Sequence, residues 1–231
     1  MAGNIIMFLF CFGVFAAAAV FCCFQRKYLL AFAAGITAFA VSQLMLRIPL
    51  LSLLNEWPMY FQWSLENPIW AGLFAAVTAG IFEETGRWIM FQTAAKKKHS
   101  WADGVLFGLG HGGIEAVWVG SKMIPYLGNP AVTSMNRFMC GFERMSCLSI
   151  HVGLTMMVLK GVRKKSRKYY LLAILLHTAV DFPIVLIHGW TLEGYVFLWG
   201  AAGVAFTLWC RTKMKYTEAE KDIYPVKEIG M

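Results

Sequence analysis

The stretch GIFEETGRWIM, residues 80–90, lies inside a long apolar segment and carries three charged side chains, Glu83, Glu84 and Arg87. A charged group near the centre of a bilayer costs about 2.5 to 3.5 kcal/mol on insertion scales, so such groups are normally paired and face the protein interior. If the surrounding segment spans a membrane, these charges predict a buried polar site.

The composition of the whole chain indicates an integral membrane protein. Of its 231 residues 58% are hydrophobic and only 15% are charged, and the mean hydropathy is +0.57. Apolar segments recur with the length of about 20 residues that a helix needs to cross a bilayer about 30 Å thick. The seven predicted spans lie near residues 4–24, 28–47, 68–95, 101–121, 138–160, 168–188 and 193–211.

The expected fold class is all-α, because these segments lack the polar alternation of a barrel strand and must satisfy their backbone hydrogen bonds within helices. We expect one integral membrane domain over residues 1–231, with a motif-bearing core at about 68–188 and a short cytoplasmic tail at 212–231. The aromatic connection before residue 68 is predicted to lie at the membrane interface, as a belt or a partial re-entrant helix.

The positive charge of the chain gathers in alternate connections. The net charge is +8, and most of the 21 lysines and arginines follow the first, third, fifth and seventh predicted spans. By the positive-inside rule these connections are cytoplasmic, which places the N-terminus outside and the C-terminus inside. The basic charge thus reflects orientation in a lipid bilayer, expected to be a bacterial cell membrane, and no nucleic-acid partner is expected.

Further ionisable side chains lie at a similar depth in neighbouring predicted spans. They are His111 and Glu115, Arg144 and His151, and His177 and Asp181. At a helical rise of about 1.5 Å per residue, Glu84 and the three histidines all lie roughly 15 Å from the cytoplasmic ends of their spans. We therefore expect these groups to meet at one level.

Helical spacing orients these side chains. His111 and Glu115 share one helix face, as do His177 and Asp181, because each pair is four residues apart. On the third span, one glutamate of residues 83–84 can face a cavity while its neighbour pairs with the arginine. Glycines at 108, 110, 112 and 113 would let backbones or a substrate approach closely.

Carboxylate and imidazole groups at one depth suit hydrolysis. A glutamate can act as a general base toward water, and an imidazole can donate to a developing oxyanion. We expect a cavity at mid-depth that opens toward the basic, cytoplasmic connections.

Three motifs follow one another on three predicted helices. They are EExxR at Glu83 to Arg87, FxxxH at Phe107 to His111, and HxxxD at His177 to Asp181. This set resembles the CAAX-processing and bacteriocin-processing (CPBP, or Abi) intramembrane proteases. The stretches FEETGRW and FGLGHGGIEA are similar, more narrowly, to the YhfC-type branch of membrane peptidases. The resemblance covers residues from about 80 to 182.

The resemblance implies that Glu83 activates water, that His111 assists it, and that His177 and Asp181 stabilise the oxyanion or position the substrate carbonyl. The wider family usually has EExxxR, so the arginine here comes one residue early, which leaves open whether Glu83 or Glu84 is the base. The catalytic candidates are Glu83, Glu84, His111, His177 and Asp181, and the supporting candidates are Arg87, Glu115, Arg144 and His151.

Two hypotheses remain for the metal requirement. The favoured one is a metal-free, glutamate-type intramembrane protease that cleaves a membrane-associated protein or peptide. The alternative is a zinc-dependent intramembrane metalloprotease, because neutral imidazole with carboxylate is suitable zinc chemistry, although no HExxH motif is present. Three or four ligands would then come from His111, Glu115, His151, His177 and Asp181.

Two further classes of protein could carry the same residues. A proton-coupled transporter also places histidine, acidic and arginine side chains near the bilayer midplane, although the sequence has no visible inverted repeat. A non-catalytic membrane protein could keep the buried charges only to hold its helices together.

Overall fold

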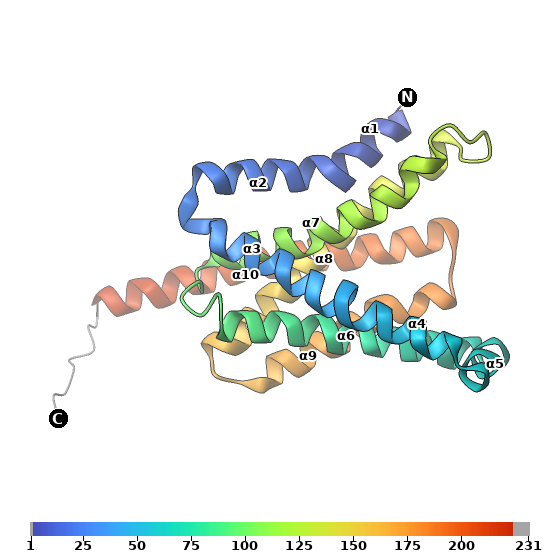
Figure 1. Ribbon diagram of the computed structural model, residues 1–231. Coiled ribbons are helices and arrows are strands. Elements are labelled where there is room, and N and C mark those ends of the chain that lie inside the picture. The colour runs from blue at the N-terminus through green and yellow to red at the C-terminus, as the bar shows by residue number, and fades with distance from the viewer. Residues whose placement is uncertain (1, 224–231) are drawn as a thin grey trace.

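Long helices that run side by side form the described part of the chain (Figure 1). This computed structural model describes residues 2–223, and it describes side chains up to residue 214. Within those residues there are no strands, which confirms the all-α prediction. The end of the predicted cytoplasmic tail, residues 224–231, lies outside the described residues.

The helices follow the predicted spans closely. In chain order they are α1 (Ala2–Phe8), η1 (Leu9–Gly13), α2 (Val14–Phe24), η2 (Arg26–Tyr28), α3 (Leu29–Phe39), η3 (Ala40–Arg47), α4 (Ile48–Glu56), α5 (Pro58–Glu66), α6 (Pro68–Gln92), α7 (Trp101–Met123), η4 (Ile124–Tyr126), α8 (Ser134–Arg163), α9 (Arg167–Asp181), η5 (Phe182–Val185) and α10 (Gly189–Ile223). Helix α10 continues past residue 212, so the first part of the predicted tail is helical.

Five helical segments are long and apolar enough to cross a membrane. They are Ala2–Phe24, Arg26–Glu56, Ser134–Arg163, Arg167–Val185 and Gly189–Met214. A sixth candidate is the pair α5 and α6, which is bent by 113°. The remaining predicted span is α7, which is not apolar enough to qualify. Each predicted range thus holds a helix, while the count of seven spans stays a prediction.

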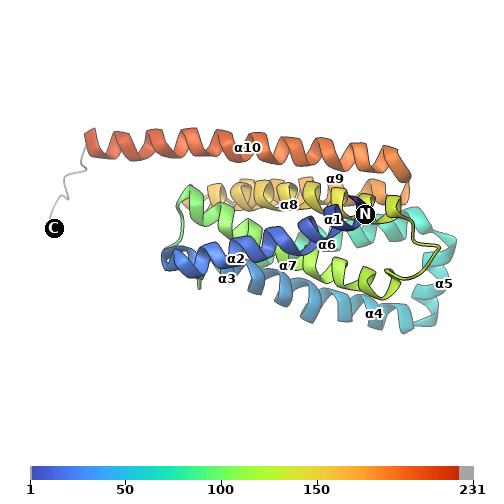
Figure 2. The ribbon, with the colours of Figure 1, turned by 90° about the horizontal axis from the view of Figure 1, so that it is seen from above.

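Helix α7 is less apolar because other helices surround it. It packs against α3 on one side and α8 on another, and α2 and η1 also contact it (Figure 2). A helix enclosed by protein need not present an apolar surface to lipid, so it can carry glycines and ionisable groups. The central position of α7 places His111 in the interior of the bundle.

Glycines let α7 approach its neighbours closely. A Cβ atom on Gly35 of α3 would lie 2.0 Å from the Phe107 carbonyl oxygen, and one on Gly110 would lie 2.3 Å from the Phe32 carbonyl oxygen. A Cβ atom on Gly108 would lie 2.7 Å from Cα of Val152 on α8. The expectation that the glycines around His111 allow close backbone approach is confirmed.

The connections divide the bundle into two ends. We call one the basic end, because it holds the lysine-rich and arginine-rich connections at residues 25–28, 93–100 and 164–166 and the C-terminal part of α10 (Figure 1). The far end holds the N-terminus, α4, α5 and the connection between α7 and α8. The aromatic connection predicted at the interface is therefore helical, and its Trp57, Phe61 and Trp63 are exposed.

Replacing Gly35 with alanine should separate α3 from α7. The added Cβ atom meets backbone, which cannot move aside as a flexible side chain would, so we expect the free energy of unfolding to fall by about 1 to 3 kcal/mol. Gly194→Ala is the matched control, since nothing lies within 4 Å of a Cβ atom on Gly194. Unfolding in detergent measures both variants, and equal stability would contradict the close α3–α7 crossing.

Candidate metal and catalytic site

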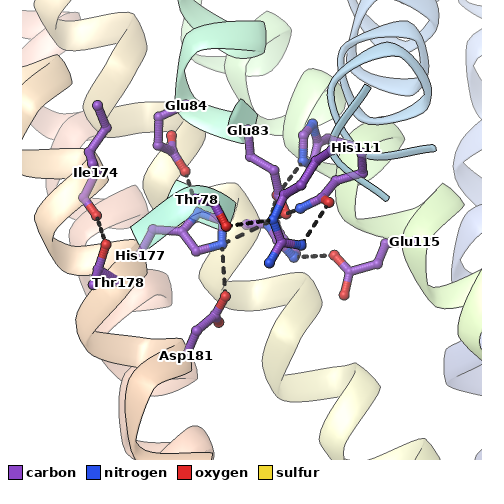
Figure 3. Close-up of polar contacts among 12 residues, drawn as sticks. Thr78, Glu83, Glu84, His111, Glu115, Ile174, His177, Thr178 and Asp181 are labelled. Atoms are coloured by element: carbon purple, nitrogen blue, oxygen red, sulfur yellow. Dashed lines mark hydrogen bonds and ion pairs between the residues drawn. The ribbon is translucent and has the colours of Figure 1, made fainter. Parts of the chain in front are cut away.

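The two adjacent glutamates of α6 are buried in the centre of the bundle (Figure 3). Glu83 Oε2 lies 2.8 Å from His111 Nε2 of α7, and Glu83 Oε1 accepts a hydrogen bond from Gln43 Nε2 of η3. Both oxygens of Glu83 therefore have partners from other helices. These contacts confirm that α6 and α7 bring ionisable groups together at one level.

Arg87 is fully buried and contacts both glutamates. Its Nη1 atom forms an ion pair with Glu84 Oε1, and its Nη2 atom lies 3.4 Å from Glu83 Oε2. The same Nη2 lies 2.7 Å from Nδ1 of His151 on α8. One guanidinium thus contacts both carboxylates, offsets one of their two negative charges and links α6 to α8, as expected for a buried counter-ion.

The two glutamates have different surroundings. Glu84 has no exposed surface, and its Oε1 lies 2.7 Å from Nδ1 of His177 on α9. Glu83 instead lines a cavity, together with His151 and His177. The expectation that one glutamate faces a cavity while its neighbour pairs with arginine from the side is met, although Arg87 also reaches Glu83.

His177 lies between the glutamates of α6 and Asp181, the last residue of α9. With Nδ1 directed at Glu84, its Nε2 atom lies 3.8 Å from Glu83 Oε1 and 3.6 Å from Asp181 Oδ2 (Figure 3). Asp181 is part-exposed to the cavity, so the His177–Asp181 pair borders the space beside Glu83.

Glu115 orients His151 from the other side. His151 Nε2 lies 2.5 Å from Glu115 Oε2, and Arg144 Nη1 donates a 2.8 Å hydrogen bond to Glu115 Oε1. Arg144 also pairs with Glu143. Because an arginine can only donate, the Arg87 contact makes Nδ1 of His151 an acceptor, which leaves Nε2 to carry the proton toward Glu115.

Gln43 and Arg47 belong to this network, although they are absent from the sequence-based set. Both lie on η3, a π-helix, and such widened turns often occur at functional sites. Arg47 donates hydrogen bonds to Gln43 Oε1 at 3.0 Å and to the carbonyl oxygen of Ala75 at 2.7 Å. The polar pair SQ at residues 42–43 inside an apolar span was the available signal.

A cavity of about 400 Å³ leads from Glu83 toward the far end of the bundle. Its lining residues are Phe39, Gln43, Arg47, Ile48, Gly72, Ala75, Ala76, Ala79, Glu83, Glu115, Trp118, Glu143, Arg144, Cys147, Ile150, His151, His177, Val180, Asp181, Ile184, Val185 and Val196. On every helix these residues lie between the level of Glu83 and the far end. The prediction of an opening toward the basic connections is therefore wrong.

Three of the buried side chains could hold a metal ion. One ligand atom from each of Glu83, His111 and His151 lies within 4.8 Å of the other two. Two imidazoles and a carboxylate are suitable ligands for zinc. Arg87 Nη2 lies 3.4 Å from Glu83 Oε2 and 2.7 Å from His151 Nδ1, so a metal ion at this group would take the place of the guanidinium beside both atoms.

This group differs from the ligand set expected from the sequence. His111 and His151 were among the expected ligands, and Glu83, the expected base, is the third member. Glu115 lies 2.5 Å from His151, His177 lies 3.8 Å from Glu83, and Asp181 lies 3.6 Å from His177. They are positioned to orient ligands or to contact a substrate.

Comparison with known proteins places the chain in a family. The chain matches the family described as YhfC intramembrane metalloprotease over residues 8–127 and 128–199. It is also similar to the "Uncharacterized membrane protein YhfC" of Bacillus subtilis (strain 168), with 31% identity over 53% of this chain and 59% of that relative. The match thus spans 59% of the relative's length. No solved structure matches the chain significantly.

The match to the family covers each helix that contributes to the site. Residues 8–199 contain Gln43 on η3, the glutamates on α6, His111 on α7, His151 on α8 and His177 on α9. The match covers most of the chain. This integral membrane protein therefore belongs to the YhfC intramembrane metalloprotease family.

Proposed function

We propose that this protein is a zinc-dependent intramembrane protease that cleaves a membrane-associated protein or peptide. The observation that carries the proposal is the buried group of Glu83, His111 and His151, whose ligand atoms lie within 4.8 Å of one another. The description of the family as a metalloprotease family supports the same chemistry.

The residues around this group suit a metal centre. Zinc held by three protein ligands supplies Lewis-acid activation of water and of a peptide carbonyl. Glu115 Oε2 lies 2.5 Å from Nε2 of His151 and so favours the proton on Nε2, which leaves Nδ1 without a proton on the side that faces Glu83. Gln43 holds one oxygen of Glu83 and leaves the other directed at His111. Such outer contacts commonly orient metal ligands.

His177 and Asp181 are proposed to act on the substrate. Nε2 of His177 borders the cavity between Glu83 and Asp181, while Nδ1 is held by Glu84. A peptide carbonyl or amide in the cavity could therefore hydrogen-bond to His177 without displacing Glu83 from its partners. Glu84 and Arg87 are positioning residues, because both are buried away from the cavity.

The metal-free glutamate mechanism favoured by the sequence is the less well supported alternative. It needs Glu83 as a base beside His111, and the 2.8 Å contact between them is compatible with that role. It gives no particular role to His151, which the structure brings to the same group. The family description also favours the metalloprotease.

Metal analysis distinguishes the two mechanisms. We expect purified protein in detergent to contain stoichiometric zinc, and His111→Ala and His151→Ala to lose it because each removes one of three ligands. His188→Ala is the matched control, since His188 is exposed and distant in sequence from the group. Folded wild-type protein that cleaves its substrate without bound metal would contradict the zinc mechanism.

Glu115→Gln should weaken zinc binding without removing a ligand. The amide keeps the size of the side chain but is a weaker acceptor for the Nε2 proton of His151, so we expect affinity to fall by about 10- to 100-fold. Competition with a zinc chelator measures the change. Glu56→Gln, at an exposed position on α4, should bind zinc as the wild type does.

Glu83→Gln should abolish proteolysis while the protein remains folded. We expect peptide N-termini generated in membranes of cells that express the wild type to disappear in cells that express this variant. N-terminal peptide mapping by mass spectrometry measures them, with Glu56→Gln as the control. Identical N-termini with wild type and Glu83→Gln would count against a protease whose site contains Glu83.

A further inference from the structure

We infer that the site receives its substrate from the extracytoplasmic side of the membrane, as a peptide segment that lies in or beside the outer half of the bilayer. That this peptide segment is a substrate rests on the proposed function. The side of access rests on the cavity and on the orientation predicted from the basic connections.

The cavity extends from the glutamates in one direction only. On α6 its lining runs from Glu83 back to Gly72, and on α9 it runs from His177 on to Asp181. These helices run in opposite directions along the bundle, yet both sets of residues lead to the far end (Figure 1). Because the basic end is predicted to be cytoplasmic, the far end is extracytoplasmic.

Buried apolar side chains lie between the glutamates and the basic end of the bundle. Phe91 of α6 and Phe107 of α7 stack with ring centroids 4.4 Å apart, and neither is exposed. Met156 and Leu159 of α8 are also buried, and they pack into the space beside Gly104. This layer lies between the glutamates and the basic connections, so it closes the direct route from the cytoplasm.

The walls of the cavity suit a peptide backbone. The α6 wall consists of Gly72, Ala75, Ala76 and Ala79 beside Glu83, and it therefore carries no large side chain into the cavity. Polar groups lie along the remaining walls and could pair with peptide groups that have left water. Such a shape fits an unwound segment better than an intact helix, which with its side chains is about 10 Å or more across.

The exposed surface at the far end also fits a membrane interface. Trp57 precedes α5 and Trp63 lies on it, with 55% and 39% of their surfaces exposed, and tryptophan is enriched where bilayer meets water. Helix α5 contacts α6 at the far end of the bundle, where the α6 wall of the cavity begins (Figure 2). A substrate segment at that interface would therefore lie next to the cavity.

The reactivity of cysteines shows from which side of the membrane the cavity can be reached. Cys147 lines the cavity, and Cys23 is exposed near the basic end of α2. A membrane-impermeant, quaternary ammonium methanethiosulfonate is the probe, because the cavity holds more carboxylates than guanidiniums. Right-side-out and inside-out membrane vesicles are treated with it, and mass spectrometry of peptides quantifies the adduct at each cysteine.

We expect the adduct at the introduced thiol of Ile184→Cys, which lines the cavity and is exposed, from right-side-out vesicles and its loss from inside-out vesicles, with the opposite pattern at Cys23. Any adduct at Cys147, on the α8 wall, should form from the same side as at Ile184→Cys. Reaction of the Ile184→Cys thiol from inside-out vesicles only, or from neither side, would overturn the inference. The assay measures no proteolysis, so a failure of the proposed function would leave its outcome unaffected.

Discussion

The burial of two carboxylates and one guanidinium on a single helix is the constraint on which the remaining structure depends. Charges in an apolar environment are costly unless each is paired and hydrogen-bonded. Glu83 and Glu84 receive contacts from η3, α7 and α9, and Arg87 reaches α8. Four neighbouring elements are thus held against α6 by groups that lipid could not satisfy.

Close backbone approach makes these contacts possible. Glycines on α3 and α7 remove the Cβ atoms that would otherwise separate the two helices, and α7 can then bring His111 to Glu83. Glycine weakens an isolated helix, but a bilayer favours helices strongly because their backbone groups have no other partners. The polar, glycine-rich character of α7 is tolerated because protein surrounds it.

The cavity and the apolar layer together match what hydrolysis inside a membrane requires. Water and a peptide must reach the glutamate, and the cavity beside Glu83 provides a route from one end of the bundle. The stacked rings of Phe91 and Phe107 close the opposite half. A site open to one side allows the reaction without a continuous aqueous path across the bilayer.

The amino-acid sequence by itself determined the membrane class, the helical fold and most members of the site, because hydropathy, depth and helical spacing are local properties of a chain. It therefore predicted that Glu84 lies at one level with His111, His151 and His177. It missed Gln43, whose importance comes from a widened π-helical turn and a partner 40 residues away. It also gave the wrong direction for the cavity. Only the tertiary structure decided which glutamate faces the cavity, that Glu83, His111 and His151 converge, and which end is closed. These features depend on helix rotation and on packing between helices distant in sequence.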